Sequence, residues 1–174
     1  MASLDLHVSV MASRATTFEY LIDFERYGEF AKSVREVRRD TDDGGIVYLT
    51  YSIAGARRQL TLRTEPVRDE WTLHWQSTEG AEHAGTAILE EVNPSRCALG
   101  IRIEHRSGIA DKAGSALGVL RARLERDMNN FANHVEQETG LRPSPDEPDY
   151  RAPSEKLFDK VFPTDESTKP SPRR

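Results

Sequence analysis

One long amphipathic segment limits what this chain can fold into. From Ile109 onward, apolar side chains recur at steps of three and four residues in one stripe, formed by Ala113, Ala116, Leu117, Leu120, Leu124, Met128, Phe131 and Val135. At ~1.5 Å per residue, a helix over this segment is roughly 40 Å long. No other segment has helical periodicity over a comparable length. The stripe must therefore pack on a β-sheet.

The sequence before this helix predicts such a sheet. Residues 4–11 alternate apolar and polar side chains, which is the period of a strand. Further strand-like runs follow at 33–39, 45–53, 58–67, 71–77, 85–92 and 96–106, separated by short turn sequences such as "DDGG" and "NPS". Strands that follow one another through short turns, with no helix between them, form an antiparallel meander.

Two short helices are predicted between the first and second strands. Ser13 is a suitable cap for the first helix, which carries Ala15, Phe18, Leu21 and Ile22 on one side. The second short helix spans Glu25 to Phe30. The predicted fold is therefore α+β, with a seven-stranded curved antiparallel sheet wrapped around one long C-terminal helix. Where the facing side chains do not fill the space between sheet and helix, this arrangement leaves a cavity.

The composition changes near Gly140. Residues 140–174 hold seven of the nine prolines and few aliphatic residues, so we predict one domain at 1–139 and a mostly disordered tail at 140–174. Within the tail, residues 155–162 place four apolar side chains at helical spacing. This short segment either rests on its own domain or docks on a protein partner.

Charge and composition narrow the function classes. The formal net charge is −5, which disfavours a nucleic-acid partner because phosphate contacts need basic surface. No apolar run approaches the ~18 residues of a membrane helix, so no stable membrane insertion is expected. The single cysteine, Cys97, and the lack of a basic apolar leader favour a cytoplasmic location. The histidines show no metal-ligand spacing and no phosphate-loop motif is present, so neither a metal nor a cofactor is predicted.

Four stretches carry a resemblance to a known superfamily. They are "ATTFEYLIDFERYGEFAKSVREV", "HWQSTEGAEHAGTAILEEV", "RIEHRSGIADKAGSALG" and "RLERDMNNFANHVEQETG". With the order of elements, they resemble the helix-grip, START/Bet v 1-like (SRPBCC) superfamily, in its branch of polyketide cyclase/dehydrases and coenzyme-Q-binding proteins. The resemblance covers residues 1–139. It implies that a hydrophobic ligand lies between the long helix and the sheet, with a mouth bordered by the two short helices.

The ligand-binding residues follow from this resemblance and from strand alternation. Tyr27 and Phe30, on the second short helix, are expected at the mouth, where aromatic side chains suit a wet edge. The remaining candidates are apolar positions that face the gap: Leu60, Leu62, Trp71, Leu73, Trp75, Leu99, Ile101, Ile103, Leu117, Leu120 and Leu124. A lining of this kind is suited to a lipid, an isoprenoid quinone or a polyketide-like ring system.

Fewer residues are candidates for a catalytic role than for ligand binding. His105 ends an apolar strand face, Tyr48 or Tyr51 could supply a hydroxyl, and His83 is expected in a turn. The aromatase/cyclases that the chain resembles use an inward tyrosine after the second short helix and an inward arginine on the fourth strand. Here Val34 occupies the first position, and Arg63 near the second is expected to point outward.

Three functions remain open from the sequence. The first is binding of a hydrophobic small molecule. The second is a cyclase, aromatase or dehydratase that acts on a chain folded in the cavity, with His105, Tyr48 or Tyr51 as the catalytic groups. The third is a non-catalytic interaction protein that acts through residues 155–162 of its tail.

Overall fold

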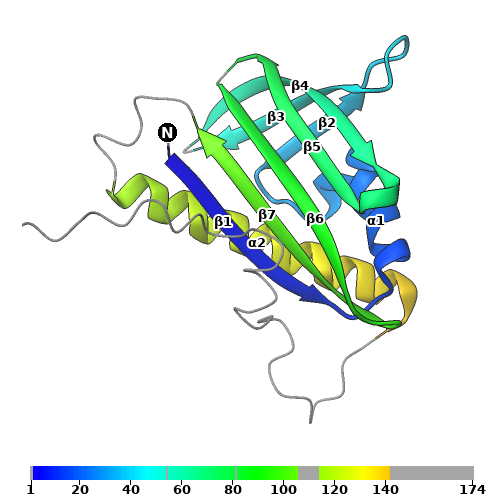
Figure 1. The fold of residues 1–174 in the computed structure, drawn as a ribbon. Helices are drawn as coiled ribbons and strands as arrows, with labels where there is room; N and C mark the ends of the chain where they lie inside the picture. Colours follow the sequence, from blue (N-terminus) through cyan, green and yellow to red (C-terminus); the bar gives the residue numbers. More distant parts are fainter. Residues whose placement is uncertain (1, 54, 81, 106–113, 142–174) are drawn as a thin grey trace, which may run out of the picture.

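The computed structural model describes residues 2–53, 55–80, 82–105 and 114–141 (Figure 1). The predicted tail segment 155–162 and the predicted helix start at 109–113 lie outside these ranges. The elements are β1 (Ala2–Val10), α1 (Arg14–Ile22), η1 (Phe24–Glu29), β2 (Val34–Arg39), β3 (Ile46–Ile53), β4 (Ala56–Val67), η2 (Arg68–Glu70), β5 (Thr72–Glu79), β6 (His83–Asn93), β7 (Arg96–His105) and α2 (Gly114–Thr139).

The strands form one antiparallel sheet in the order β1-β7-β6-β5-β4-β3-β2. Strands β2 to β7 follow one another as a meander, and β1 returns to pair with β7 at the opposite end from β2. The sheet curves around α2, which runs beside β1 (Figure 1). The predicted α+β helix-grip fold is confirmed.

The core lies between α2 and the β1 side of the sheet. Leu4, Leu6, Val8 and Val10 alternate along β1 and are all buried, as their period of two predicts. Four apolar residues in the second half of α2 are buried with them: Met128, Phe131, Ala132 and Val135. Packing is therefore complete along this side, which leaves any unfilled space to the other side of the helix.

The two short helices differ in type. Ser13 caps α1 as predicted, because its Oγ accepts a hydrogen bond of 3.1 Å from the Thr16 amide. The second helix, η1, is a 3₁₀ helix, and Phe30 donates its amide hydrogen to the Tyr27 carbonyl just past its end. It has no side-chain cap and only six residues, conditions in which the tighter 3₁₀ turn is common.

Polar contacts anchor the C-terminal end of α2. Glu136 is buried, and its Oε1 accepts a hydrogen bond of 3.0 Å from the Met11 amide just past β1. Gly140 follows the helix with a φ of 71°, a left-handed conformation that glycine adopts at little cost. This end of α2 is thus held at the base of the sheet.

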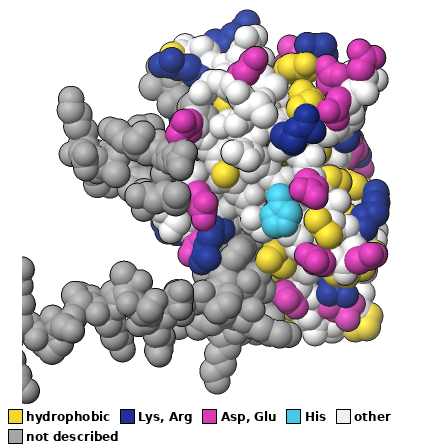
Figure 2. All heavy atoms as spheres, turned by 45° about the horizontal axis from the view of Figure 1, so that its top comes forward, with side chains coloured by type: hydrophobic (Ala, Val, Ile, Leu, Met, Phe, Trp, Pro, Cys, Tyr) yellow, Lys and Arg dark blue, Asp and Glu magenta, His cyan; other side chains and the backbone are white. Residues whose placement is uncertain are grey.

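The surface mixes charges of both signs. Figure 2 shows acidic and basic side chains interspersed on one face, with hydrophobic side chains in small separate areas. The large hydrophobic side chains that are exposed within the described part of the chain are Val92, Val119 and Leu141. Neither α1 nor α2 is long and apolar enough to cross a membrane.

We expect Gly118→Ala to raise the free energy of unfolding by about 1 kcal/mol, because glycine lowers the stability of a helix interior by about that amount. Gly118 is exposed on α2, and a Cβ added there meets nothing within 4 Å. Urea unfolding followed by circular dichroism measures the change. Gly85→Ala provides a contrast, because an added Cβ there would come within 2.1 Å of the Trp75 ring and should destabilise the fold. A destabilised Gly118→Ala variant would contradict the prediction.

Candidate ligand-binding cavity

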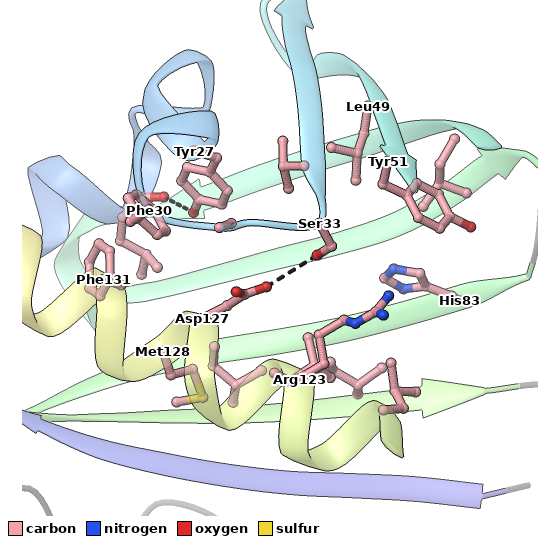
Figure 3. Close-up of a pocket in the computed structure, with 18 of the residues that line it drawn as sticks. Tyr27, Phe30, Ser33, Leu49, Tyr51, His83, Arg123, Asp127, Met128 and Phe131 are labelled. Atoms are coloured by element: carbon pink, nitrogen blue, oxygen red, sulfur yellow. Dashed lines mark hydrogen bonds between the residues drawn. The ribbon is translucent and has the colours of Figure 1, made fainter. Parts of the chain in front are cut away.

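A cavity of about 300 Å³ lies between α2, η1 and the inner face of the sheet (Figure 3). Most of the side chains around it are apolar. They come from α1, from η1 and the loop after it, from the strands β2, β3, β4, β6 and β7, and from one face of α2. The lining residues are Leu21, Tyr27, Phe30, Ala31, Ser33, Val34, Leu49, Tyr51, Leu60, His83, Leu99, Ile101, Ile103, Leu120, Arg123, Leu124, Asp127, Met128 and Phe131.

The structure brings together eight of the residues that the sequence predicts for ligand binding. They come from η1, β4, β7 and α2, which are far apart in the chain. These residues are Tyr27, Phe30, Leu60, Leu99, Ile101, Ile103, Leu120 and Leu124. The side chain of Leu117 is not among those that the structure describes.

Four other predicted residues do not line this cavity, and Trp71 and Leu73 are two of them. Trp71 has a left-handed backbone, with a φ of 54°, and precedes β5, so the alternation of that strand does not apply to it. Its ring packs edge-on against Phe18, with 5.8 Å between ring centres, beneath the Arg14 guanidinium. Leu73 is buried in the hydrophobic core.

Trp75 and Leu62 are the other two. The ring of Trp75 lies flat along the sheet over Gly85, where no larger residue fits, and its Nε1 donates a hydrogen bond of 3.2 Å to Nδ1 of His83. Leu62 pairs with Ser77 next to an irregularity in the β4–β5 ladder and is half-buried. Alternation identified the face of each strand but not which side chains on that face reach the cavity.

The cavity has an aromatic end (Figure 3). The ring of Phe30 packs against those of Tyr27, Phe131 and His134, with ring centres 5.2, 5.3 and 5.5 Å apart. The Tyr27 hydroxyl donates a hydrogen bond to the Leu21 carbonyl, and burial raises the pKa of Tyr27. This hydroxyl is therefore protonated at neutral pH and already has an acceptor.

The opposite end is polar, with Tyr51, His83 and Arg123 around it (Figure 3). Arg123 Nη1 donates a hydrogen bond of 3.3 Å to the Ser52 carbonyl. Because Nδ1 of His83 accepts from Trp75, a neutral His83 ring carries its proton on Nε2. The polar end therefore carries polar hydrogen atoms on two side chains, Tyr51 and Arg123, next to the His83 ring.

Asp127 lies between the two ends. Its Oδ2 accepts a hydrogen bond of 3.2 Å from the Ser33 hydroxyl, and its carboxylate also accepts from the Lys32 amide. Burial raises the pKa of Asp127, and these hydrogen bonds together with the nearby charges of Arg123 and Arg126 offset part of that rise. The carboxylate is thus oriented by the chain that follows η1.

Arg123, Asp127 and His83 line the cavity, although none of them is among the predicted site residues. Arg123 and Asp127 are four residues apart and each precedes a member of the apolar stripe, Leu124 and Met128. This spacing places them along one edge of the stripe and could have indicated a polar strip beside the cavity. His83 is the first residue of β6 and not part of a turn, because that strand extends two residues beyond its predicted start.

The three residues predicted as catalytic candidates, Tyr48, Tyr51 and His105, lie in different places in the structure. Tyr51 lines the cavity, whereas Tyr48, three residues earlier on the same strand, faces the opposite side. Its hydroxyl donates a hydrogen bond of 2.7 Å to Asp40, and its ring lies under the Arg38 guanidinium. His105 is the last residue of β7 and pairs with His83 of β6. Its side chain is not among those that the structure describes. Tyr48 therefore lies outside this site.

The two positions that hold an inward tyrosine and an inward arginine in the aromatase/cyclases are occupied differently in this protein. Val34 lines the cavity with an apolar side chain. Arg63 points away from it and pairs with Asp43 at 3.2 Å. Thr64, beside it, is buried and donates its hydroxyl to the Gly45 carbonyl. The tyrosine and arginine of the pair are therefore missing from these two places.

One cluster beside the cavity has atoms spaced like metal ligands. Within the described ranges, Glu29, His134 and Glu138 bring ligand atoms within 4.8 Å of one another. Arg26 pairs with both carboxylates, at 2.9 Å to Glu29 and 2.8 Å to Glu138. The cluster therefore joins η1 to α2 through an ion-pair network, and its two carboxylates already face a cation.

We expect Asp127 to make stability depend on pH. Because its pKa is raised in the folded protein, the folded state favours the protonated carboxyl, so this contribution is present below the ordinary pKa and is lost as the pH rises through the raised one. The stability of the wild type relative to Asp127→Asn should therefore fall as the pH rises from about 3 to about 7. Urea unfolding of both proteins over this range measures the difference.

Asp40→Asn is the matched control for this measurement. Hydrogen bonds from the Asp43 amide, the Tyr48 hydroxyl and the Asp42 amide lower the pKa of Asp40. Its contribution is therefore present above the ordinary pKa and is lost as the pH falls. A relative stability that changes with pH in the same direction for both variants would contradict the assignment for Asp127.

Known structures show the same fold at low sequence identity. The aromatase/cyclase Zhui from Streptomyces sp. R1128 aligns with 79% of this chain and 95% of its own, at a TM-score of 0.64 and 18% identity. A START superfamily protein from Mycobacterium smegmatis aligns with 78% of this chain and 98% of its own, at a TM-score of 0.58 and 19% identity. The di-domain ARO/CYC BexL of the BE-7585A biosynthetic pathway aligns with 80% of this chain, at a TM-score of 0.66 and 16% identity. The aligned region is 48% of the BexL chain, so this chain spans about half the length of that protein.

Sequence comparison gives the family. No curated protein sequence matches the chain. The family described as "Polyketide cyclase / dehydrase and lipid transport" matches residues 10–163, which is most of the sequence and includes every residue that lines the cavity. The chain therefore belongs to the polyketide cyclase/dehydrase and lipid transport family, and it shares its fold with the START and aromatase/cyclase structures.

Proposed function

We propose that this protein binds a hydrophobic small molecule in the cavity between α2 and the sheet. The observation that carries the proposal is the cavity itself, with its volume of about 300 Å³ and mainly apolar walls. Ligand pockets are typically concave, apolar and supplied with a few polar groups, at volumes of roughly 300 Å³ upward. A lipid, an isoprenoid quinone or a polyketide-like ring system has a surface of this character.

Desolvation supplies the driving force in this proposal. A ligand that buries ~200 Å² of apolar surface gains roughly 5 kcal/mol from leaving water, at ~25 cal/mol per Å². Lost translational and rotational freedom offsets part of that gain. Leu99, Ile101 and Ile103 of β7 face Leu120 and Leu124 of α2 across the space, so both faces of a flat ligand meet apolar side chains.

Native mass spectrometry of freshly purified protein, followed by solvent extraction of any bound molecule, tests this proposal directly. A bound lipid, quinone or aromatic molecule at a one-to-one ratio supports it and identifies the ligand class. Titration with the neutral fluorescent probe N-phenyl-1-naphthylamine gives a second measurement. Protein that is purified empty and also fails to bind the probe would refute the proposal.

A second function, cyclisation or dehydration of a poly-β-keto chain, is favoured by one observation. Tyr51, His83 and Arg123 place donors at one end of an apolar cavity. Such donors stabilise the enolate oxygen that forms when the Asp127 carboxylate, which lines the same cavity, takes the proton from a carbon next to a carbonyl. The cavity walls would hold the chain in a folded conformation, which favours ring closure through orientation.

Turnover separates the two functions. A catalyst should convert a poly-β-keto substrate in the presence of wild-type protein, and His83→Ala should lose turnover while it keeps binding. Binding of the product without any turnover by wild-type protein would leave the binding function and exclude the catalytic one for that substrate.

A further inference from the structure

Arg123 is the arginine, among the described residues, that lines the cavity. Other arginines lie at ion-pair distance from a carboxylate, among them Arg26, Arg63, Arg68, Arg102 and Arg121. Arg123 has no carboxylate at ion-pair distance among the described residues, and its Nη1 donates a hydrogen bond of 3.3 Å to the neutral Ser52 carbonyl. A guanidinium has five donors, so most of its hydrogen-bonding capacity remains.

The position of Arg123 makes this charge unusual. It is half-buried and lines a mainly apolar cavity, where charge is costly unless it is balanced. The Asp127 carboxylate, four residues along α2, interacts electrostatically with Arg123 without an ion-pair contact, and it accepts hydrogen bonds from Ser33 and from the Lys32 amide. Figure 3 shows the guanidinium on the side of His83, away from the Ser33–Asp127 hydrogen bond.

Neighbouring groups reinforce the same chemistry. Tyr51 lines this end of the cavity, and its hydroxyl has no hydrogen-bond partner within the described ranges. A guanidinium and a phenol are both donors, and donors at one end of a cavity are complementary to an oxygen anion.

We propose that the cavity selects ligands that carry one anionic oxygen group, such as a carboxylate, on an apolar body, and that Arg123 is the residue that binds this group. The proposal rests on the binding function proposed above. In this arrangement the anion lies against Arg123 and Tyr51, and the apolar body extends toward the aromatic end at Phe30 and Phe131. A general attraction for anions would not explain such selectivity, because the chain has a net charge of −5.

A matched pair of ligands tests this selectivity. 2-Naphthoate and 2-naphthamide have nearly the same shape, but only the first is charged at neutral pH. Their affinities are measured by displacement of N-phenyl-1-naphthylamine, which is neutral. We expect 2-naphthoate to bind wild-type protein about tenfold more tightly than 2-naphthamide, as a charge-assisted hydrogen bond in a partly buried site allows.

Variants assign the effect to Arg123. In Arg123→Gln the ratio of the two affinities should fall to about one, while binding of the neutral probe remains. Arg126→Gln removes the same charge from an exposed position on α2 and should leave the ratio unchanged. If Arg123→Gln does not fold, Tyr51→Phe serves instead and should lower the ratio about threefold, through loss of one neutral donor.

The outcomes distinguish this proposal from the one on which it rests. If the neutral probe binds but wild-type protein does not prefer 2-naphthoate, the anion selectivity is wrong and the binding function stands. A preference that persists unchanged in Arg123→Gln would overturn the role of Arg123. If neither naphthalene ligand nor the probe binds, the binding function fails, and the selectivity fails with it.

Discussion

Leu124→Trp is expected to lower the affinity for N-phenyl-1-naphthylamine by roughly 100-fold, or about 2.7 kcal/mol. Leu124 is half-buried on the inner side of α2 and lines the cavity beside Leu120. An indole at this position would extend into the space that the probe needs. The cavity, at about 300 Å³, is large enough to accept the new ring without displacing the sheet. Fluorescence titration measures the loss.

Val119→Trp is the matched control for this variant. Val119 is on the same helix but 63% exposed, so a tryptophan there faces solvent and should leave the affinity unchanged. Urea unfolding of both variants checks that the fold survives, because an overpacked core costs about 1–3 kcal/mol. Equal affinity in Leu124→Trp and the wild type would show that the probe binds elsewhere on the protein.

Phe18→Ala is expected to have the largest effect on stability. Phe18 is 0% exposed on α1, where its ring meets the edge of Trp71 and lies beneath the Arg68 guanidinium. Removal of a buried phenylalanine ring typically lowers the free energy of unfolding by about 3–5 kcal/mol, because the lost burial and the cavity left behind both contribute. Chemical unfolding followed by circular dichroism and by tryptophan fluorescence measures the loss.

Two further variants interpret this result. Phe18→Leu keeps most of the apolar volume and should recover more than half of the stability lost in the alanine variant. Val119→Ala truncates an exposed apolar side chain and should change stability by no more than about 0.5 kcal/mol. A loss below about 1 kcal/mol in Phe18→Ala would mean that α1 does not pack on the sheet as described here.

The sequence by itself determined the fold. A single long apolar stripe on α2 needs an equally long apolar partner, and the alternation along β1 and β7 provides one. The turn sequences between the strands restrict the sheet to an antiparallel meander. These features are local periodicities, so they can be read without knowledge of contacts between distant residues. The same periodicities placed Leu99, Ile101 and Ile103 on the inner face.

Only the tertiary structure decided which inner residues reach the cavity. Trp75 and Ile103 share a face of the sheet, but the Trp75 ring occupies the space over Gly85, which has no side chain. The alternation within one strand does not show that the neighbouring strand has a glycine at this point. Arg123 lies just beside the apolar stripe of α2, a position that periodicity alone does not assign to the cavity. The curvature of the sheet, which keeps α2 close to β1 and leaves space beside it, turns that edge of the helix inward. Periodicity gives the direction of a side chain within its own element, whereas the distance to the opposite wall depends on how all the elements pack.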